Sequence, residues 1–388
     1  MYEVLTLNKI AKCGLDMLDS DIFTVTDSCE NPDAVILRSF SMHDMELPKS
    51  LLAVARAGAG VNNIPIDKCS EKGIVVFNTP GANANAVAEL TLAALLLSSR
   101  KIVDGINWAN TLKGEGENVG KLVEKGKGAF VGPEIKGKTL GVIGLGAIGV
   151  MVANLADAMG MKVIGYDPYI SIDAAWGLSR SVKKANDLKM MVSQCDYITM
   201  HLPLNDSTKG MINEEIFDCM EQGTRLLNFA RGGLVDTDAL KAAIANGKIA
   251  CYVTDFPDEE TLGLENTINI PHLGASTPES EDNCAVMAAK ELSDFVRFGT
   301  IKNSVNYPNC EMAMEGKYRV TIAHKNIPNM VSTISSLFAD ENINIINMIN
   351  KSKKDNAYTI VDADSVPDAL EEKIEHVDGV HKVRVIKA

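Results

Sequence analysis

The chain has 388 residues, more than one hydrophobic core usually supports, so its length predicts two or three domains. With 46% hydrophobic and 23% charged residues it has the composition of a globular protein, and no apolar run is long enough to span a bilayer. The formal net charge of −13 argues against nucleic acid as a partner.

The N-terminal residues contain no basic segment leading into an apolar one, so we expect a cytoplasmic protein without a signal peptide. The eight cysteines are scattered, without a CxxC pair or any spacing typical of a metal site. We therefore expect reduced, mostly buried thiols, no metal and no membrane partner.

Five short apolar runs alternate with helical patterns in the first third of the chain, which predicts a small α/β domain of the flavodoxin-like type. The expected strands are residues 4–7, 23–25, 34–37, 52–55 and 73–77. Arg38 with Ser39, and Arg56 with its glycine-rich loop, follow two of these strands at the sheet edge where ligands bind. The arginines are candidates for holding an anion, although each would more often be a solvated loop residue.

A long apolar helix leaves this domain and precedes a strand, a glycine-rich turn and another helix. In that turn Gly144 permits tight backbone geometry, Gly146 lets backbone amides approach a pyrophosphate, and Gly149 lets the helix pack closely on the strand. The phosphates of a dinucleotide would lie at the helix N-terminus, beside the amides of Ala147 and Ile148.

The next strand, expected over residues 162–166, ends at Asp167, which lies 18 residues after Gly149. This spacing is close to the ~20 residues that separate such a glycine motif from the acid that binds a ribose hydroxyl. A carboxylate here repels a 2′-phosphate, so NAD is favoured over NADP as the cofactor. Further strands, which complete the pattern of a doubly wound Rossmann-type domain, are expected over residues 196–200, 225–229 and 251–254.

Three residues near the ends of these strands suit the oxidation of a hydroxy acid, namely Arg231, Glu260 and His272. Arginine can hold a carboxylate as a fork, histidine can take the hydroxyl proton, and glutamate can orient the imidazole. His201 also ends a strand and is an alternative base, although a purely structural histidine is the more ordinary interpretation of it. Asp255 follows the last of these strands and could accept a hydrogen bond from the nicotinamide amide.

A helical stretch over residues 278–298 has no strand after it, so we expect it to return to the first domain and make that domain discontinuous. The segment after it carries Pro308 and little periodicity, as a linker does. The end of the chain follows the order βαββαβ, which is the ferredoxin-like order. The expected domains are a substrate-binding domain of residues 1–92 and 278–303, an NAD-binding domain of residues 93–277, a linker of residues 304–316 and a C-terminal domain of residues 317–388.

These motifs resemble those of the D-isomer-specific 2-hydroxy acid dehydrogenases, and the resemblance covers essentially the whole chain. It is carried by residues 144–149 with Asp167, 228–233, Asp255 with Glu260, and 271–277. The resemblance implies catalytic roles for Arg231, Glu260 and His272, and it selects His272 as the base. It further implies cofactor-binding residues that include His201, Pro203, Ala230 and Asp255. The substrate-binding residues that it implies are Arg38, Ser39, Arg56, Gly58, Gly60 and Asn83.

The loops that carry Arg38 and Arg56 are similar to those with which members of this family bind a phosphorylated acid. The implied activity is NAD-dependent oxidation of a phosphorylated 2-hydroxy acid. Pro257 falls one place earlier than is common, which leaves Glu259 as an alternative to Glu260. Two alternative functions stay open, a glyoxylate or hydroxypyruvate reductase and a non-enzymatic NAD-sensing protein.

The C-terminal domain resembles an ACT domain, a module that binds small molecules such as amino acids. His324, Asn326 and Asn344 match positions that bind serine in similar enzymes, so L-serine is an expected effector. Asn329 stands where a glycine is usual and puts a side chain near that position. Because an ACT unit has open sheet edges and pairs with another, we expect a homodimer or homotetramer.

Overall fold

The protein is described by a computed structural model that covers residues 1–387 and forms two compact units. The first unit contains residues 1–83 and the chain from residue 278 onward, and the second contains residues 84–277. Residues 84–92, which the sequence analysis assigns to the substrate-binding domain, therefore lie in the second unit, because they begin the long helix α3 (Ala84–Arg100) that packs there.

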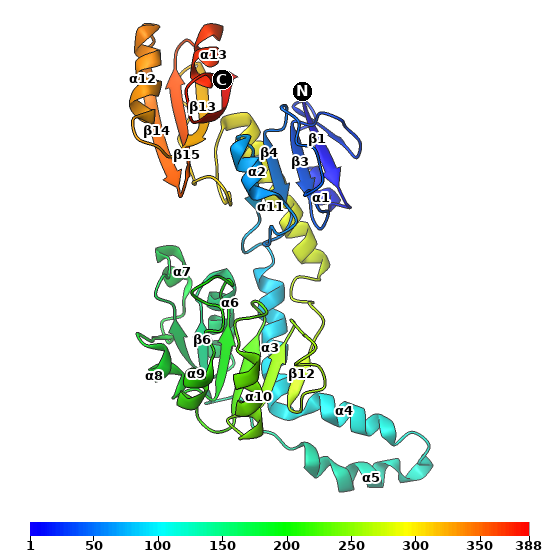
Figure 1. The fold of residues 1–388 in the computed structure, drawn as a ribbon. Helices are drawn as coiled ribbons and strands as arrows, with labels where there is room; N and C mark the ends of the chain where they lie inside the picture. Colours follow the sequence, from blue (N-terminus) through cyan, green and yellow to red (C-terminus); the bar gives the residue numbers. More distant parts are fainter. Residues whose placement is uncertain (388) are drawn as a thin grey trace. The chain divides into compact units, whose positions relative to one another are not determined.

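The first unit begins with a five-stranded parallel sheet in the order β2-β1-β3-β4-β5 (Figure 1). All five expected strands are present, and apolar residues are buried on both faces of the sheet, as is usual for parallel sheets. The helix α11 (Pro278–Phe298) contacts β4 and α1 and so brings the chain back to this sheet. The other elements are β1 Tyr2–Leu7, α1 Lys12–Leu15, β2 Phe23–Thr26, β3 Ala34–Leu37, β4 Ala53–Arg56, α2 Ile66–Glu71 and β5 Val75–Asn78.

The same unit ends in a four-stranded antiparallel sheet in the order β14-β15-β13-β16. Its elements follow one another as βαββαβ, and one face of the sheet is covered by the two helices around Phe338 and Leu370. The bounds are β13 Tyr318–Lys325, α12 Met330–Asp340, β14 Ile345–Lys353, β15 Asn356–Ala363, α13 Asp368–Glu375 and β16 Val380–Lys387.

The antiparallel sheet and the first sheet share one hydrophobic core. Tyr358 of β15 packs into the same cluster as Phe295 of α11, and its hydroxyl donates to the carbonyl of Gly299 at 3.0 Å. The first part of the connecting segment is packed, since Tyr307 and Cys310 are almost completely buried, whereas residues 311–316 are exposed or half-buried. The C-terminal sheet and the first sheet therefore pack together within the first unit.

The second unit is built on a seven-stranded sheet in the order β12-β11-β10-β9-β6-β7-β8, in which every pairing is parallel. This is the doubly wound Rossmann-type order, and the expected strands are all present. The sequence analysis missed the short edge strands β8 and β12. The strands are β6 Thr139–Ile143, β7 Lys162–Tyr166, β8 Lys183–Lys184, β9 Tyr197–Met200, β10 Thr224–Asn228, β11 Ile249–Thr254 and β12 Thr267–Asn269.

Helices lie on both faces of this sheet. Asp187, Asn213 and Asp236 each cap a helix by accepting a hydrogen bond from a first-turn amide, which explains why α8, α9 and α10 begin where they do. The helices other than α3 are α4 Ile102–Thr111, α5 Val119–Gly126, α6 Ala147–Ala158, α7 Ile172–Gly177, α8 Leu188–Val192, α9 Glu214–Cys219 and α10 Thr237–Ala245, with short 3-10 helices at Gly116–Asn118 and Lys127–Phe130.

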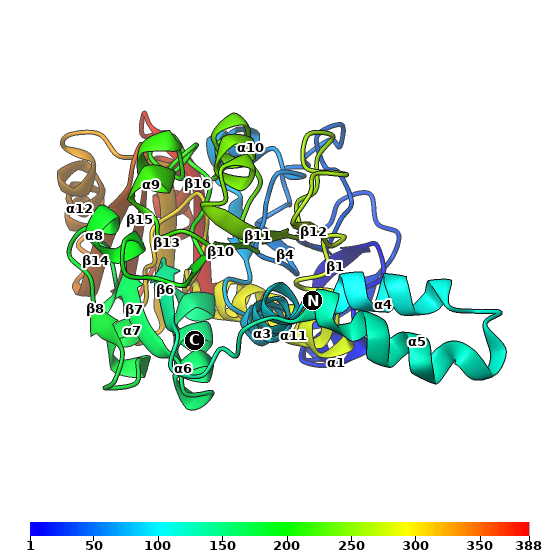
Figure 2. The same ribbon diagram turned by 90° about the horizontal axis from the view of Figure 1, so that it is seen from below.

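The helices α4 and α5 form a hairpin that projects from the second unit (Figures 1 and 2). None of their residues is buried, and the rings of Trp108 and Phe130 pack together at 5.2 Å. The sequence analysis did not predict this hairpin. Across residues 1–387, no helix is both long and apolar enough to cross a membrane.

Candidate functional site

The glycine turn between β6 and α6 has two positions that exclude any side chain. Gly144 has φ +89°, and a Cβ there would lie 2.5 Å from the carbonyl oxygen of His201. A Cβ on Gly149 would lie 1.9 Å from the carbonyl oxygen of Gly144. The glycines at these two positions therefore allow the strand, the turn and the helix to pack together.

Gly146 is different, because a Cβ there would have no atom within 4 Å. It is the N-cap of α6, and the first intrahelical hydrogen bond runs from the Val150 amide to its carbonyl at 3.0 Å. The amides of Ala147, Ile148 and Gly149 in the first turn thus have no partner within the helix. The open space beside Gly146 and these amides suit the pyrophosphate of a dinucleotide.

Asp167 follows β7 and lies beside this turn. Its Oδ2 accepts a hydrogen bond from the Leu145 amide at 2.8 Å, and its Oδ1 accepts one from the Tyr169 amide at 2.8 Å. A carboxylate has about four acceptor sites, so a ribose hydroxyl can still donate to it. The position fits the role that the sequence predicts.

His201 follows β9, and its imidazole is enclosed. Its Nε2 lies 3.1 Å from the hydroxyl of Thr199, whereas its Nδ1 is buried without a partner among the described residues. Burial lowers the pKa of His201 from 6.5 to about 3, so the ring stays neutral near pH 7. A neutral ring with so low a pKa is a poor proton acceptor, which favours a cofactor-side role over that of the base.

Two other cofactor candidates lie on the same side of the sheet. Pro203 is exposed, and its carbonyl accepts a hydrogen bond from the Thr208 hydroxyl at 2.7 Å. Ala230 is buried after β10, and its carbonyl accepts a hydrogen bond from Nη1 of Arg231 at 2.7 Å.

Asn228, at the end of β10, shapes the loop that presents Arg231. Its side-chain amide donates to the carbonyl of Arg231 at 2.9 Å, and its carbonyl oxygen accepts from the Ala230 amide at 3.2 Å. Asn228 is buried, whereas the Arg231 side chain is exposed. This role of Asn228 was not predicted from the sequence, because Ala230 and Arg231 become its partners only in the folded loop.

Asp255 is buried at the end of β11, near both Arg231 and His272. Its Oδ2 accepts a hydrogen bond from the Gly274 amide at 3.3 Å, while its Oδ1 is buried without a partner in the described part of the chain. Burial raises the pKa of Asp255, and the charges of His272 and Arg231 lower it in part. The structure therefore brings an arginine, a carboxylate and a histidine together within the second unit.

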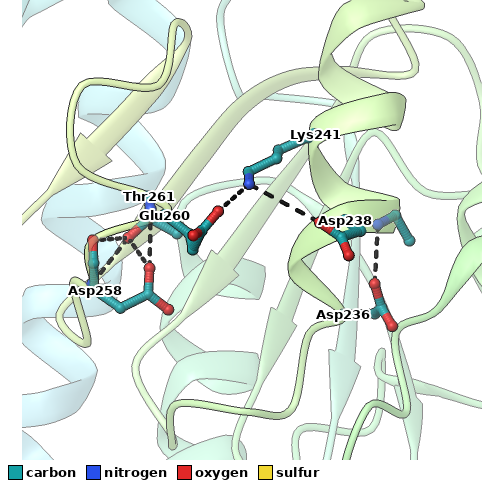
Figure 3. A network of polar contacts seen from close by, with 7 residues as sticks. Asp236, Asp238, Lys241, Asp258, Glu260 and Thr261 are labelled. Atoms are coloured by element: carbon teal, nitrogen blue, oxygen red, sulfur yellow. Dashed lines mark hydrogen bonds and ion pairs between the residues drawn. The ribbon is translucent and has the colours of Figure 1, made fainter.

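His272 is exposed, and its ring packs against Phe256 with 4.6 Å between the ring centroids. Glu260, which the sequence analysis assigns to the same catalytic set, forms an ion pair with Lys241 instead of contacting His272 (Figure 3). Asp258 holds the turn that contains Glu260 by accepting hydrogen bonds from the amide and hydroxyl of Thr261 at 2.9 Å each. Glu259 is exposed on the same loop.

In the first unit, the predicted substrate residues gather after β3 and β4. Nε of Arg56 donates to the carbonyl of Arg38 at 3.0 Å, and Nη1 of Arg38 lies 2.7 Å from Oε1 of Glu281. A Cβ on Gly58 would lie 2.5 Å from Nη1 of Arg56, so the glycine makes room for the guanidinium. The partner Glu281 could not be inferred from the sequence, because it lies on α11, far along the chain.

The remaining substrate candidates border the same loops. The Ser39 amide donates to the side chain of Asn8 at 3.1 Å. Gly60 is further from Arg56 than Gly58, with a Cβ position 3.6 Å from its Nη1. Asn83 is half-buried and is the last residue of the first unit before α3.

Residues 92–274 match the family model described as the D-isomer-specific 2-hydroxyacid dehydrogenase, NAD-binding domain. A putative D-3-phosphoglycerate dehydrogenase of Schizosaccharomyces pombe is 31% identical over 354 residues, which cover 84% of this chain and 72% of that protein. The chain belongs to the D-isomer-specific 2-hydroxyacid dehydrogenase family. The glycine turn and Asp167 therefore lie in this family's NAD-binding domain.

Relatives in this family include longer proteins. The D-3-phosphoglycerate dehydrogenase of Methanocaldococcus jannaschii is 34% identical over 332 residues, covering 83% of this chain and 60% of that protein. The chain likewise spans only 52% and 56% of the matched enzymes of Archaeoglobus fulgidus and Synechocystis. It thus spans little more than half the length of these relatives.

Solved structures of the family share the fold. The NAD+-bound 3-phosphoglycerate dehydrogenase of Entamoeba histolytica aligns with a TM-score of 0.60 at 26% identity, over 79% of this chain and 98% of that one. A glyoxylate/hydroxypyruvate reductase of Sinorhizobium meliloti aligns with a TM-score of 0.65 at 22% identity, again over 79% and 98% of the two chains. The second likeness shows the dehydrogenase fold alone.

The three candidate effector residues, His324, Asn326 and Asn344, differ in how accessible their side chains are to a ligand. His324 is buried, with Nε2 2.8 Å from the Thr359 hydroxyl and Nδ1 2.8 Å from the carbonyl of Lys325, so both ring nitrogens are occupied. Asn344 is exposed, and Asn326 lines a cavity of about 220 Å³. The cavity lies within the first unit, and its other lining residues are Ser70, Glu71, Lys325, Ile327, Asp355, Asn356 and His381.

Asn329 adopts φ +68° at the N-cap of α12. Asparagine tolerates this left-handed conformation better than most residues with a side chain. The turn therefore forms in this protein with asparagine in place of the usual glycine.

Proposed function

We propose that the protein oxidises D-3-phosphoglycerate with NAD to 3-phosphohydroxypyruvate, the first step of serine biosynthesis. The observation that carries the proposal is the arginine pair after β3 and β4: the Arg56 side chain donates to the backbone carbonyl of Arg38, and the charges of both arginines act on the thiol of Cys284. Two arginines on neighbouring loops suit a phosphate, and this otherwise acidic chain needs such a local basic site for a phosphorylated acid. Curated relatives named D-3-phosphoglycerate dehydrogenase at 34% and 35% identity support the choice.

NAD, when bound to the glycine turn and Asp167, supplies the hydride acceptor. In the oxidation, Arg231 holds the substrate carboxylate and His272 takes the proton of the C2 hydroxyl, while the C2 hydride leaves and the C2–O bond becomes a carbonyl. Asp255, whose Oδ1 lacks a partner in the described chain, would accept a hydrogen bond from the nicotinamide amide when NAD is bound.

Glu260 is proposed to support the imidazolium that forms on His272. Because Glu260 is paired with Lys241, this support requires the carboxylate to exchange one cation for another. The pair is partly exposed, so the exchange costs little. Glu259 on the same loop is the alternative partner.

The proposal is tested by steady-state kinetics with NAD and 3-phosphoglycerate, beside D-glycerate as the matched unphosphorylated acid. We expect kcat/KM to favour the phosphorylated acid by at least about tenfold, since the arginine pair binds only its phosphate. Equal kcat/KM values for the two acids would contradict the assignment.

A glyoxylate or hydroxypyruvate reductase is the second candidate function. It is favoured by the ion pair of Arg38 with Glu281, which leaves one of the two guanidinium groups already neutralised. Faster reduction of hydroxypyruvate than of its phosphorylated form would support this alternative.

We also propose that the C-terminal sheet is an ACT domain that binds L-serine and controls activity. Since both nitrogens of His324 are occupied, Asn326 and the cavity it lines are the better candidate site. Glu71 and Lys325 on the cavity wall can pair with the ammonium and carboxylate of an amino acid. Calorimetric titration with L-serine, and loss of the signal in Asn326→Ala, tests the effector site, and no heat from the wild type would refute it.

The partner is proposed to be a second copy of the chain, giving a homodimer or homotetramer. The hairpin of α4 and α5 supports this, because Ile106 within α4 and Val131 just after the hairpin are 55% and 75% exposed. Light scattering gives the oligomeric state, and Ile106→Glu is expected to weaken assembly.

A further inference from the structure

Glu281, in the first turn of α11, forms an ion pair with the guanidinium of Arg38. Nη1 of Arg38 lies 2.7 Å from Oε1 of Glu281, and the two side chains are 41% and 46% exposed. Both residues belong to the first unit, so the contact does not depend on how the two units are placed. An anion that binds Arg38 must therefore compete with the carboxylate of Glu281 for the same guanidinium.

The side chain of Arg56 reaches the same loop, and its Nε donates to the backbone carbonyl of Arg38 at 3.0 Å. Cys284 lies three residues after Glu281 on α11, and the same charges affect the pKa of its thiol. Burial raises the pKa of the Cys284 thiol most, the carboxylate of Glu281 also raises it, and the charges of Arg38 and Arg56 lower it. The cluster thus places two cations and one anion around the same point of α11.

We propose that Glu281 is an internal counter-anion that sets the affinity of this arginine cluster for phosphate. A phosphate that binds Arg38 must displace the Glu281 carboxylate or share the guanidinium with it. The partly exposed ion pair is weak by itself, so displacement is feasible. The carboxylate nevertheless repels a phosphate dianion over a few ångströms, and this repulsion lowers the affinity of the site. Glu281 is therefore a residue that tunes specificity, without contacting the reacting atoms.

The first test is calorimetric titration of the full chain with inorganic phosphate at low salt. Glu281→Gln keeps the shape of the side chain and removes its charge, and we expect phosphate to bind about fivefold more tightly. Glu279→Gln is the matched control, because Glu279 is exposed in the same helical turn and its loss changes the net charge equally. It is expected to bind phosphate as the wild type does.

The same substitution in an Arg38→Gln background tests whether the effect of Glu281 on phosphate affinity depends on Arg38. In Arg38→Gln, adding Glu281→Gln is expected to raise phosphate affinity by clearly less than it does in the wild type, since the guanidinium that the two anions share is gone and only the repulsion between them is relieved. Thermal unfolding of each variant checks that it folds as the wild type does. The proposal is wrong if Glu281→Gln binds phosphate no better than the wild type, if Glu279→Gln gains equally, or if no variant binds phosphate measurably.

Kinetics extend the test and rest on the proposed phosphoglycerate activity. In Glu281→Gln, KM for 3-phosphoglycerate is expected to fall by a similar factor of about five, and by more than any change in kcat. Tighter phosphate binding without turnover of 3-phosphoglycerate would uphold the role of Glu281 and refute the proposed function. Turnover of 3-phosphoglycerate, with phosphate affinity and KM unchanged in Glu281→Gln, would support the proposed function and refute the role of Glu281.

Discussion

Substitution of two glycines of the turn, Gly146 and Gly149, by alanine should have opposite consequences. A Cβ at Gly149 would lie 1.9 Å from the carbonyl oxygen of Gly144, so strand and helix must separate. Overpacking of this kind costs about 1–3 kcal/mol. At roughly 2–4 °C per kcal/mol for a unit of this size, Gly149→Ala should lower the melting temperature by up to about 10 °C.

Gly146→Ala should leave stability nearly unchanged. A Cβ there has no neighbour within 4 Å, and its backbone conformation, φ −76° and ψ −163°, is open to alanine. The loss is therefore below about 1 kcal/mol, the scale of a helix-cap substitution. The new methyl group would instead occupy the space proposed for the pyrophosphate, and the Kd for NAD should rise at least about tenfold.

Two assays separate the variants, namely thermal unfolding without ligand and fluorescence titration with NAD. We expect a large fall in melting temperature for Gly149→Ala, and for Gly146→Ala a large rise in Kd with a melting temperature lowered by no more than about 4 °C. If Gly146→Ala binds NAD as the wild type does, the pyrophosphate does not lie beside Gly146.

Three further substitutions test other parts of the account. His272→Ala should lower kcat by about 10²–10⁴ with NAD affinity unchanged, and unchanged turnover would remove His272 from its role as base. Burial lowers the pKa of His201 from 6.5 to about 3, so the unfolded chain takes up the proton first and stability is lost as pH falls through this window. Urea unfolding at several pH values should show a smaller loss in His201→Leu. Asp362→Asn leaves the buried guanidinium of Arg319 without its bidentate partner at 2.7 and 2.8 Å, and should cost about 3–5 kcal/mol in urea unfolding. An unchanged urea midpoint would contradict that assignment.

The elements that were predicted correctly have strong local signals. The strand, glycine turn and helix over residues 139–158 combine a β-branched apolar run, three glycines and an apolar helix, all read from neighbours in the chain. The hairpin of α4 and α5 was missed because none of the residues in either helix is buried, so no buried stripe marks the helices. The two-residue strand β8 is too short to show any periodicity.

The contacts that modify the candidate site are all distant in the chain. Glu281 meets Arg38 only because α11 returns to the first sheet, and Lys241 meets Glu260 because α10 lies beside the loop after β11. His324 is enclosed by Thr359 on the neighbouring strand, which removes it from a surface site. Residue types and spacing identify candidates, whereas partners such as these decide which of them is accessible.

The central claim is that this chain turns over a phosphorylated 2-hydroxy acid with NAD. Reduction of NAD, followed by absorbance at saturating 3-phosphoglycerate and separately at saturating D-glycerate, tests it most directly. We expect NADH formation at low 3-phosphoglycerate concentration, with a KM that rises when Arg38 is replaced by glutamate. Turnover of D-glycerate with equal efficiency, or a KM for 3-phosphoglycerate unaffected by Arg38→Glu, would contradict it.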